Sequence, residues 1–218
     1  MLCYGGGMAR PRLYDPDVVL DAAESLAVDG GPGAVTIRAV AAAAGVSNGA
    51  IYHSFESRAA LVARTWLRAA RRFLALQSEL VESALAAGVP TDAVVAAADA
   101  LGIFADRSPR SARLLASVSR DQLVGAGAPA EVDAELVAVD RVLVDLLIRL
   151  AGAVWDRRDA AAVDVITTCV VDLPTAILLA RTRLDDTTAR IQLREAVRAV
   201  LAVGPPSRTA RPSRSHRR

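Results

Sequence analysis

The feature that most constrains the fold is the stretch Thr36–Leu61, which reads TIRAVAAAAGVSNGAIYHSFESRAAL. After Thr36, apolar side chains recur at i, i+3, i+4 and i+7, a spacing that predicts one buried face on a short helix. Gly45 follows at a point where a left-handed residue is common, and Ser47 is a favourable N-cap for a second helix. The stretch therefore predicts two short helices joined by a tight turn, with Ser57 capping a third.

The second of these helices is predicted to keep polar side chains on its outer side. Ile51 and Phe55, four residues apart, are expected to point inward. The outer side then carries an amide, a glycine, a phenol and an imidazole, from Asn48, Gly49, Tyr52 and His53. Many proteins present a helix of such a pair to the DNA major groove. We therefore predict that Ser47, Asn48, Gly49, Tyr52 and His53 belong to a DNA-binding face. In this face Asn48 and His53 are expected to reach base edges and Tyr52 to meet a phosphate.

Two arginines stand at the starts of the flanking helices. Arg38 falls in the first turn of the helix opened by Thr36, and Arg58 in the first turn of the helix capped by Ser57. A cation there opposes the helix dipole, at a cost of about 0.3–1 kcal/mol. A phosphate beside it would accept hydrogen bonds from the free helix N–H groups and the guanidinium. Thr36, Arg38 and Arg58 are therefore predicted to lie against DNA, although each arginine alone would also suit a solvated surface.

The same residues carry a family resemblance. The runs T-I-R-A-V-A, G-V-S, G-A-I-Y-H-S-F and E-S-R-A-A-L stand together in Thr36–Leu61, which resembles the N-terminal DNA-binding domain of the TetR family of bacterial transcriptional regulators. The resemblance continues upstream through Tyr14–Gly30. Two positions depart from the usual pattern, since Ala50 stands where threonine is common and Arg58 where lysine is common. Arg58 keeps the charge, so the departures bear on sequence preference more than on DNA binding.

The resemblance implies an all-α protein with an N-terminal three-helix DNA-binding domain and a larger C-terminal helical domain for ligand binding and dimerisation. We expect residues 1–8 to be disordered or to precede the true start, with Met1 and Met8 both open as the start. The helix-turn-helix domain is expected at 9–60, the effector-binding and dimerisation domain at 61–203, and a disordered arginine-rich tail at 204–218.

Composition and pattern favour helices throughout. Of the 218 residues, 53% are hydrophobic but only 4% aromatic, and alanine is abundant, which suits closely packed helices better than sheets. Asp15-Pro16 is expected to start the first helix and the glycines at 30–33 to end it. A helix from Ser57 to about Leu85 is predicted to bridge the two domains. Further helices are predicted at 91–106, 109–122, 129–155, 159–183, with a kink at Pro174, and 187–203.

The resemblance also implies partners. The last two helices, rich in Val, Ile, Leu and Ala, would pair with their twins in a homodimer that reads a palindromic operator, with recognition helices about 34–36 Å apart. A small effector would bind among the central helices, and the few charges on the predicted inner faces favour a neutral or apolar one. The candidate lining residues are Trp66, Phe104, Leu115, Gln122, Trp155 and Thr168.

Charge and cysteine content narrow the function classes. The net charge is +2 and all 26 basic residues are arginine, so an arginine here says less about phosphate binding than it would elsewhere. Five of them lie in residues 205–218 without an acid, which leaves the rest of the chain slightly acidic. Only Cys3 and Cys169 are present, and His53 and His216 lack neighbours at ligand spacing, so we predict no disulfide framework, metal or cofactor. No window approaches 18 uninterrupted apolar residues, and we expect a cytoplasmic protein without membrane contact.

Two other classes of protein compete with a regulator. An enzyme lacks support, because no glycine-rich loop follows a strand and no Ser/His/Asp set is present, so no enzymatic activity is predicted. A helical interaction module that binds protein rather than DNA stays open because of the slightly acidic balance. The favoured prediction is a sequence-specific DNA-binding transcriptional regulator, a repressor that a small effector releases from its operator.

Overall fold

Helices make up all the regular secondary structure in the computed structural model, which describes residues 15–118, 123, 127 and 129–207. The all-α prediction is confirmed. The predicted N-terminal segment 1–8, and residues 208–218 of the predicted tail, lie outside the described residues. In chain order the elements are α1 (Pro16–Gly30), the 3-10 turn η1 (Pro32–Ala34), α2 (Ile37–Ala44), α3 (Asn48–Phe55), α4 (Arg58–Ala86), α5 (Pro90–Arg107), α6 (Pro109–Ser117), α8 (Ala130–Trp155), α9 (Ala160–Thr167), the π-helical turns η2 (Thr168–Asp172) and η3 (Thr175–Leu179), and α10 (Thr187–Val203).

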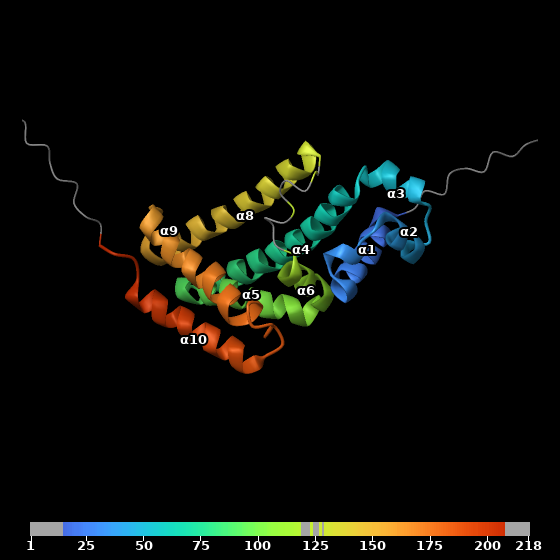
Figure 1. Ribbon diagram of the computed structural model, residues 1–218. Helices are drawn as coiled ribbons and strands as arrows, with labels where there is room; N and C mark the ends of the chain where they lie inside the picture. The colour runs from blue at the N-terminus through green and yellow to red at the C-terminus, as the bar shows by residue number, and fades with distance from the viewer. Residues whose placement is uncertain (1–14, 119–122, 124–126, 128, 208–218) are drawn as a thin grey trace, which may run out of the picture.

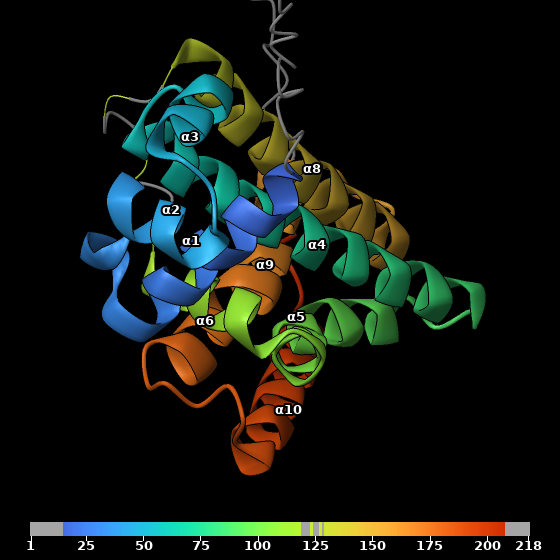
Figure 2. The same cartoon turned by 90° about the vertical axis from the view of Figure 1, so that its right-hand side faces the viewer.

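The long helix α4 connects two groups of helices. α1, α2 and α3 gather at its N-terminal end, and α9 and α10 lie towards the other end of the molecule (Figure 1). α5 and α8 pack along α4, and α10 packs on α5. Figure 2 looks onto the α1–α3 end and shows α6 beneath α1, where the two helices are in contact. The single bridging helix predicted from the sequence is therefore present.

Side-chain caps start the first four α-helices where the sequence predicts them. Each cap accepts a hydrogen bond from a backbone N–H group that would otherwise have no partner in the first turn of its helix. The four pairs are Asp15 with the N–H of Asp17 at 2.9 Å, Thr36 with Ala39 at 3.1 Å, Ser47 with Ala50 at 3.1 Å, and Ser57 with Ala60 at 3.0 Å. The starts of these helices therefore coincide with local capping hydrogen bonds.

The turn between α2 and α3 depends on Gly45, whose φ of 67° and ψ of 29° are left-handed. A Cβ built at Gly45 would meet no atom within 4 Å, so only the backbone conformation opposes a side chain there. We expect Gly45→Ala to lower the free energy of unfolding by about 1 kcal/mol, measured by urea denaturation. Gly33→Ala, also in open space but without a positive φ, is the control and should change it by less than about 0.5 kcal/mol. Equal losses in the two variants would contradict this explanation.

The chain around Pro174 differs from the single helix predicted for 159–183. α9 ends at Thr167, and π-helical turns lie on both sides of Pro174. The N–H of Leu173 donates to the carbonyl of Thr168, and that of Ala180 to the carbonyl of Thr175 at 2.9 Å. Proline has no N–H to donate, and wider turns of this kind are a known way for a helix to continue past such a defect. The helix predicted at 109–122 is also shorter, because α6 ends at Ser117.

Two apolar cores fill the molecule. One joins α1–α3 to the first half of α4 and includes Leu114 from α6 and Leu136 from α8. The other lies among the second half of α4, α5, the second half of α8, α9 and α10. Phe73, Leu115 and Leu143 are partly buried and pack against both cores. The two groups of helices therefore share side chains at their junction.

Candidate nucleic-acid interface and central cavity

Helix α3 presents a polar side to solvent over a buried inner side. Ile51 is fully buried and Phe55 is 3% exposed. Tyr52 is 54% exposed, and Asn48, Gly49 and His53 are also exposed. The structure therefore places these four residues on the outer side of the helix, as the spacing predicted. Their contacts with DNA remain a prediction.

The other residues predicted to contact DNA lie at the starts of α2, α3 and α4. Thr36 and Ser47 are exposed, and both hydroxyls are engaged as the caps of α2 and α3. A capping hydroxyl keeps its own proton and can still donate it to a phosphate. Arg38 is exposed in the first turn of α2. These positions are compatible with phosphate contacts along the edges of the α3 face.

Arg58 has a second role that the sequence did not reveal. Its Nε donates to the carbonyl of Val35 and its Nη2 to the carbonyl of Pro32, each at 2.5 Å. The guanidinium therefore ties the start of α4 to the loop that follows α1. Because its partners are backbone carbonyls, no pattern of side chains could have indicated this contact. Arg58 has fewer N–H groups left for a phosphate than Arg38 has.

A buried ionic network joins α1, α4 and α6. Glu24 is 6% exposed and accepts hydrogen bonds from the Ser111 hydroxyl at 2.6 Å and from Arg68 Nη2 at 2.8 Å. Arg68 also pairs with Asp17 at 3.2 Å and Asp21 at 2.7 Å. Burial lowers the pKa of Arg68, but hydrogen bonds to the three carboxylates outweigh it, so the net pKa is raised and the guanidinium stays charged. Sequence patterns do not indicate this network, because its members lie 44 and 87 positions apart.

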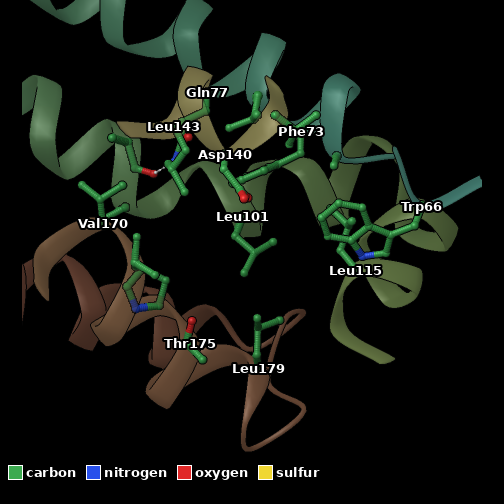
Figure 3. Close-up of a pocket in the computed structure, with 17 residues that line it drawn as sticks. Trp66, Phe73, Gln77, Leu101, Leu115, Asp140, Leu143, Val170, Thr175 and Leu179 are labelled. Carbon is green, nitrogen blue, oxygen red and sulfur yellow. Dashed lines mark hydrogen bonds between the residues drawn. The ribbon is translucent and has the colours of Figure 1, made fainter. Parts of the chain in front are cut away.

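A cavity of about 250 Å³ lies where the two cores meet (Figure 3). Its walls come from α4, α5, α6, α8, η2 and η3 and are mostly apolar. Side chains in Figure 3 converge on it from these separate elements, among them Trp66 and Phe73 from α4, Leu101 from α5, Leu115 from α6, Leu143 from α8 and Leu179 from η3. The polar side chains in its wall are Gln77, Asp140 and Thr175. A largely apolar hollow with a few polar groups is the usual form of a small-molecule site.

Of the six residues predicted to line a pocket, two line this cavity, three do not and one is not described. Trp66 and Leu115 line the cavity, and the Trp66 indole N–H donates to the carbonyl of Val118 at 2.9 Å, just beyond α6. Phe104 is 2% exposed and packs behind the wall, edge-on to Phe73 with ring centroids 5.7 Å apart. Trp155 and Thr168 are not among the lining residues, and Gln122 lies outside the described residues.

Metal and thiol chemistry have no support in the part of the chain that the structure describes. No group of three or more His, Cys, Asp or Glu side chains there could hold a metal ion. Cys169 is fully buried, and burial raises the pKa of its thiol to about 11. Such a thiol is protonated at neutral pH and is an ordinary core side chain.

The fold and the N-terminal sequence are both similar to those of known proteins. Residues 19–65 match the family model described as bacterial regulatory proteins, tetR family. A search of curated proteins found no match to the chain. The chain is similar in fold to a transcriptional regulator from Rhodococcus sp. Rha1, with 20% identity, a TM-score of 0.66, and coverage of 89% of this chain and 100% of the other.

Two further solved structures are also similar in fold to this chain. The TetR-family regulator PfmR from Thermus thermophilus shows 17% identity and a TM-score of 0.62, over 84% of this chain and 97% of its own. The regulator FadR from Bacillus subtilis, solved in complex with stearoyl-CoA, shows 13% identity and a TM-score of 0.61, over 84% of this chain and 97% of its own. The matched segment contains the whole helix-turn-helix, and the fold extends over both groups of helices. Residues 19–65 therefore form an N-terminal DNA-binding domain of the tetR family of bacterial regulatory proteins, and the chain as a whole shares the fold of these solved regulators.

Proposed function

We propose that this protein is a cytoplasmic transcriptional repressor, without enzymatic activity, that binds a palindromic operator as a homodimer. We also propose that a small neutral or apolar effector releases it from the operator. The single observation that carries the DNA-binding part is α3, whose polar side is exposed while Ile51 and Phe55 hold the inner side in the core. A firmly seated helix with a free polar side is what insertion into a major groove requires.

The proposed contacts follow from the chemistry of each side chain. Asn48 and His53 would read base edges, since the Asn amide can bond adenine through two atoms at once. Tyr52 and Arg38 would hold phosphates, helped by the N–H groups at the start of α2. Gly49 would let the backbone of α3 approach the groove closely.

The homodimer is supported by apolar surface at the end of the molecule away from α3. The segment Ala160–Leu179 has a mean hydropathy of 1.8, yet only 33% of its most apolar window is buried within one chain. By length and composition alone it is the one described helical segment that could cross a membrane, a test that core helices of soluble proteins also pass. Ile191 of the neighbouring α10 is 48% exposed. A second copy related by a two-fold axis would cover these side chains.

The proposed coupling between effector and DNA runs through α4 and α6. Both helices line the cavity, through Trp66 and Leu115, and both are tied to α1 by the hydrogen bonds of Glu24 with Arg68 and Ser111. α1 in turn packs on α2. An effector that binds better when the cavity is wider would move α4 and α6, and with them the α1–α3 unit. The two α3 helices of a dimer would then no longer match the operator spacing.

Footprinting on the DNA that flanks the coding region tests the proposal, with two variants of the assigned face. Arg38→Ala should weaken binding to all sequences alike and reduce the slope of log affinity against log salt by about two units, one for each protomer of the dimer. Asn48→Ala should instead change sequence preference, by about 1–3 kcal/mol at one base pair. Arg141→Ala, an exposed arginine of α8, is the matched control and should bind as the wild type does.

Two results would count against the proposal. If both Arg38→Ala and Asn48→Ala bound the operator like the wild type, the DNA-binding face would be wrongly assigned. If affinity for this DNA changed little between about 50 and 200 mM salt, phosphate contacts would be absent, and a helical protein-interaction module would become the better description.

A further inference from the structure

One buried polar atom in the cavity wall lacks a hydrogen-bond partner. Gln77 is 1% exposed, and its Nε2 donates to the carbonyl of Ala97 at 2.9 Å. Its Oε1 is buried and has no partner within the part of the chain that the structure describes. Figure 3 shows the side chain reaching from α4 towards the cavity that it lines. Buried amide oxygens are nearly always hydrogen-bonded in folded proteins, so this one has capacity for a donor from a bound molecule.

The rest of the wall limits what that molecule can be. Trp66 and Phe73 offer aromatic surface, and most other lining side chains are aliphatic. Asp140 of α8 adds a carboxylate, and no arginine or histidine is among the described lining residues. A bound anion would therefore lie in a mostly apolar surrounding without a cationic side chain among the described lining residues, which is unfavourable. The volume of about 250 Å³ is also small for a ligand site, since pockets for drug-sized ligands are usually about 300–1,000 Å³.

We propose that the effector is a compact, uncharged and largely aromatic molecule with one hydroxyl group, and that this hydroxyl donates its hydrogen bond to Gln77 Oε1. The inference rests on the proposed function, because it assigns the chemical class of the effector that the cavity accepts. Gln77 is then the specificity-determining residue of the cavity. The aromatic rings of Trp66 and Phe73 provide the apolar surface against which the ligand packs.

Isothermal titration calorimetry on the full chain tests this class with three probes of similar size. 1-Naphthol carries the hydroxyl donor, 1-methoxynaphthalene has the same ring without a donor, and 1-naphthoate carries an anion. The wild type should bind 1-naphthol about 3- to 10-fold more tightly than the ether, as expected for one hydrogen bond to a neutral acceptor. 1-Naphthoate should bind most weakly of the three.

Two variants locate the effect. Gln77→Met removes Oε1 at similar volume, so the naphthol-to-ether ratio should fall to about one while the ether still binds. Leu101→Phe narrows the cavity and should weaken both probes together. Equal affinity for 1-naphthol and its ether in the wild type would overturn the proposal, whether or not Gln77→Met folds. The proposal would also be overturned if Gln77→Met kept the wild-type ratio of naphthol to ether affinity. The same holds if 1-naphthoate bound most tightly of the three probes, or if no probe bound at all.

A parallel measurement of operator binding without probes separates this inference from the proposed function. If the protein binds its operator but does not distinguish 1-naphthol from the ether, the ligand class is wrong and the regulator proposal stands. If it distinguishes the probes through Gln77 but binds no DNA, the ligand specificity of the cavity is right and the regulator proposal fails.

Discussion

Arg68→Ala is expected to lower the free energy of unfolding by about 3–5 kcal/mol, the usual cost of removing one partner from a buried ion pair. Glu24 is 6% exposed and would keep only the Ser111 hydroxyl as a hydrogen-bond donor. Its negative charge would then lie in the protein interior without the guanidinium that pairs with it in the wild type. Asp17 and Asp21 are exposed, so water can take over their share of the guanidinium contacts.

Urea denaturation with matched substitutions measures this loss. Arg71→Ala is the control, because Arg71 lies one turn further along α4 and pairs with Glu135 at 2.6 Å in a more exposed setting, with side chains 53% and 34% exposed. Its loss should be below about 1 kcal/mol, as for other surface pairs. If the two variants lost similar stability, burial of the Glu24 network would not be the source of its strength.

Phe55→Ala should also cost about 3–5 kcal/mol of unfolding free energy, because Phe55 is 3% exposed and its removal leaves a cavity beneath α3. Tyr52→Ala, three residues earlier on the same helix, should change stability by less than about 0.5 kcal/mol, since Tyr52 is 54% exposed. The same Tyr52 variant should lose at least about tenfold in operator affinity for each protomer of the dimer, the usual size of a hydrogen bond to a charged phosphate.

Urea denaturation and fluorescence anisotropy with labelled operator DNA separate the two effects. Phe55→Ala would lower operator affinity through the unfolded fraction, so a stabilising osmolyte should restore part of its binding. Tyr52→Ala should stay weak under the same conditions. A Tyr52 variant that binds DNA normally, or one that unfolds as easily as Phe55→Ala, would refute the assignment of the outer face.

The helix-turn-helix could be predicted in detail because its determinants are local. Thr36, Ser47 and Ser57 cap helices within three residues of themselves, and Gly45 adopts the left-handed conformation that its position indicated. Each signal depends on a few neighbours along the chain. The burial of Phe55 and the exposure of Tyr52 then follow from helical periodicity alone.

The cavity and the junction could be predicted only in outline, because they depend on contacts between distant segments. Periodicity shows which side of a helix is buried, but not which helix covers it. Phe104 was therefore predicted in the pocket wall although it lies behind Phe73. Gln77 was overlooked, since a lone glutamine in an apolar helix carries no signal until its Oε1 is found without a partner.

Phe73, Leu115 and Leu143 pack against both cores, so the two cores should unfold cooperatively. A fragment cut near residue 60 would lose Leu67 and Leu74 of α4 and Leu136 of α8 from the core that supports α3. The DNA-reading end is therefore not an autonomous folding unit, and heat should melt the described helices in one transition rather than two. A chimera that takes helices α1–α3 from a relative would therefore also need the residues of α4, α6 and α8 that pack against them.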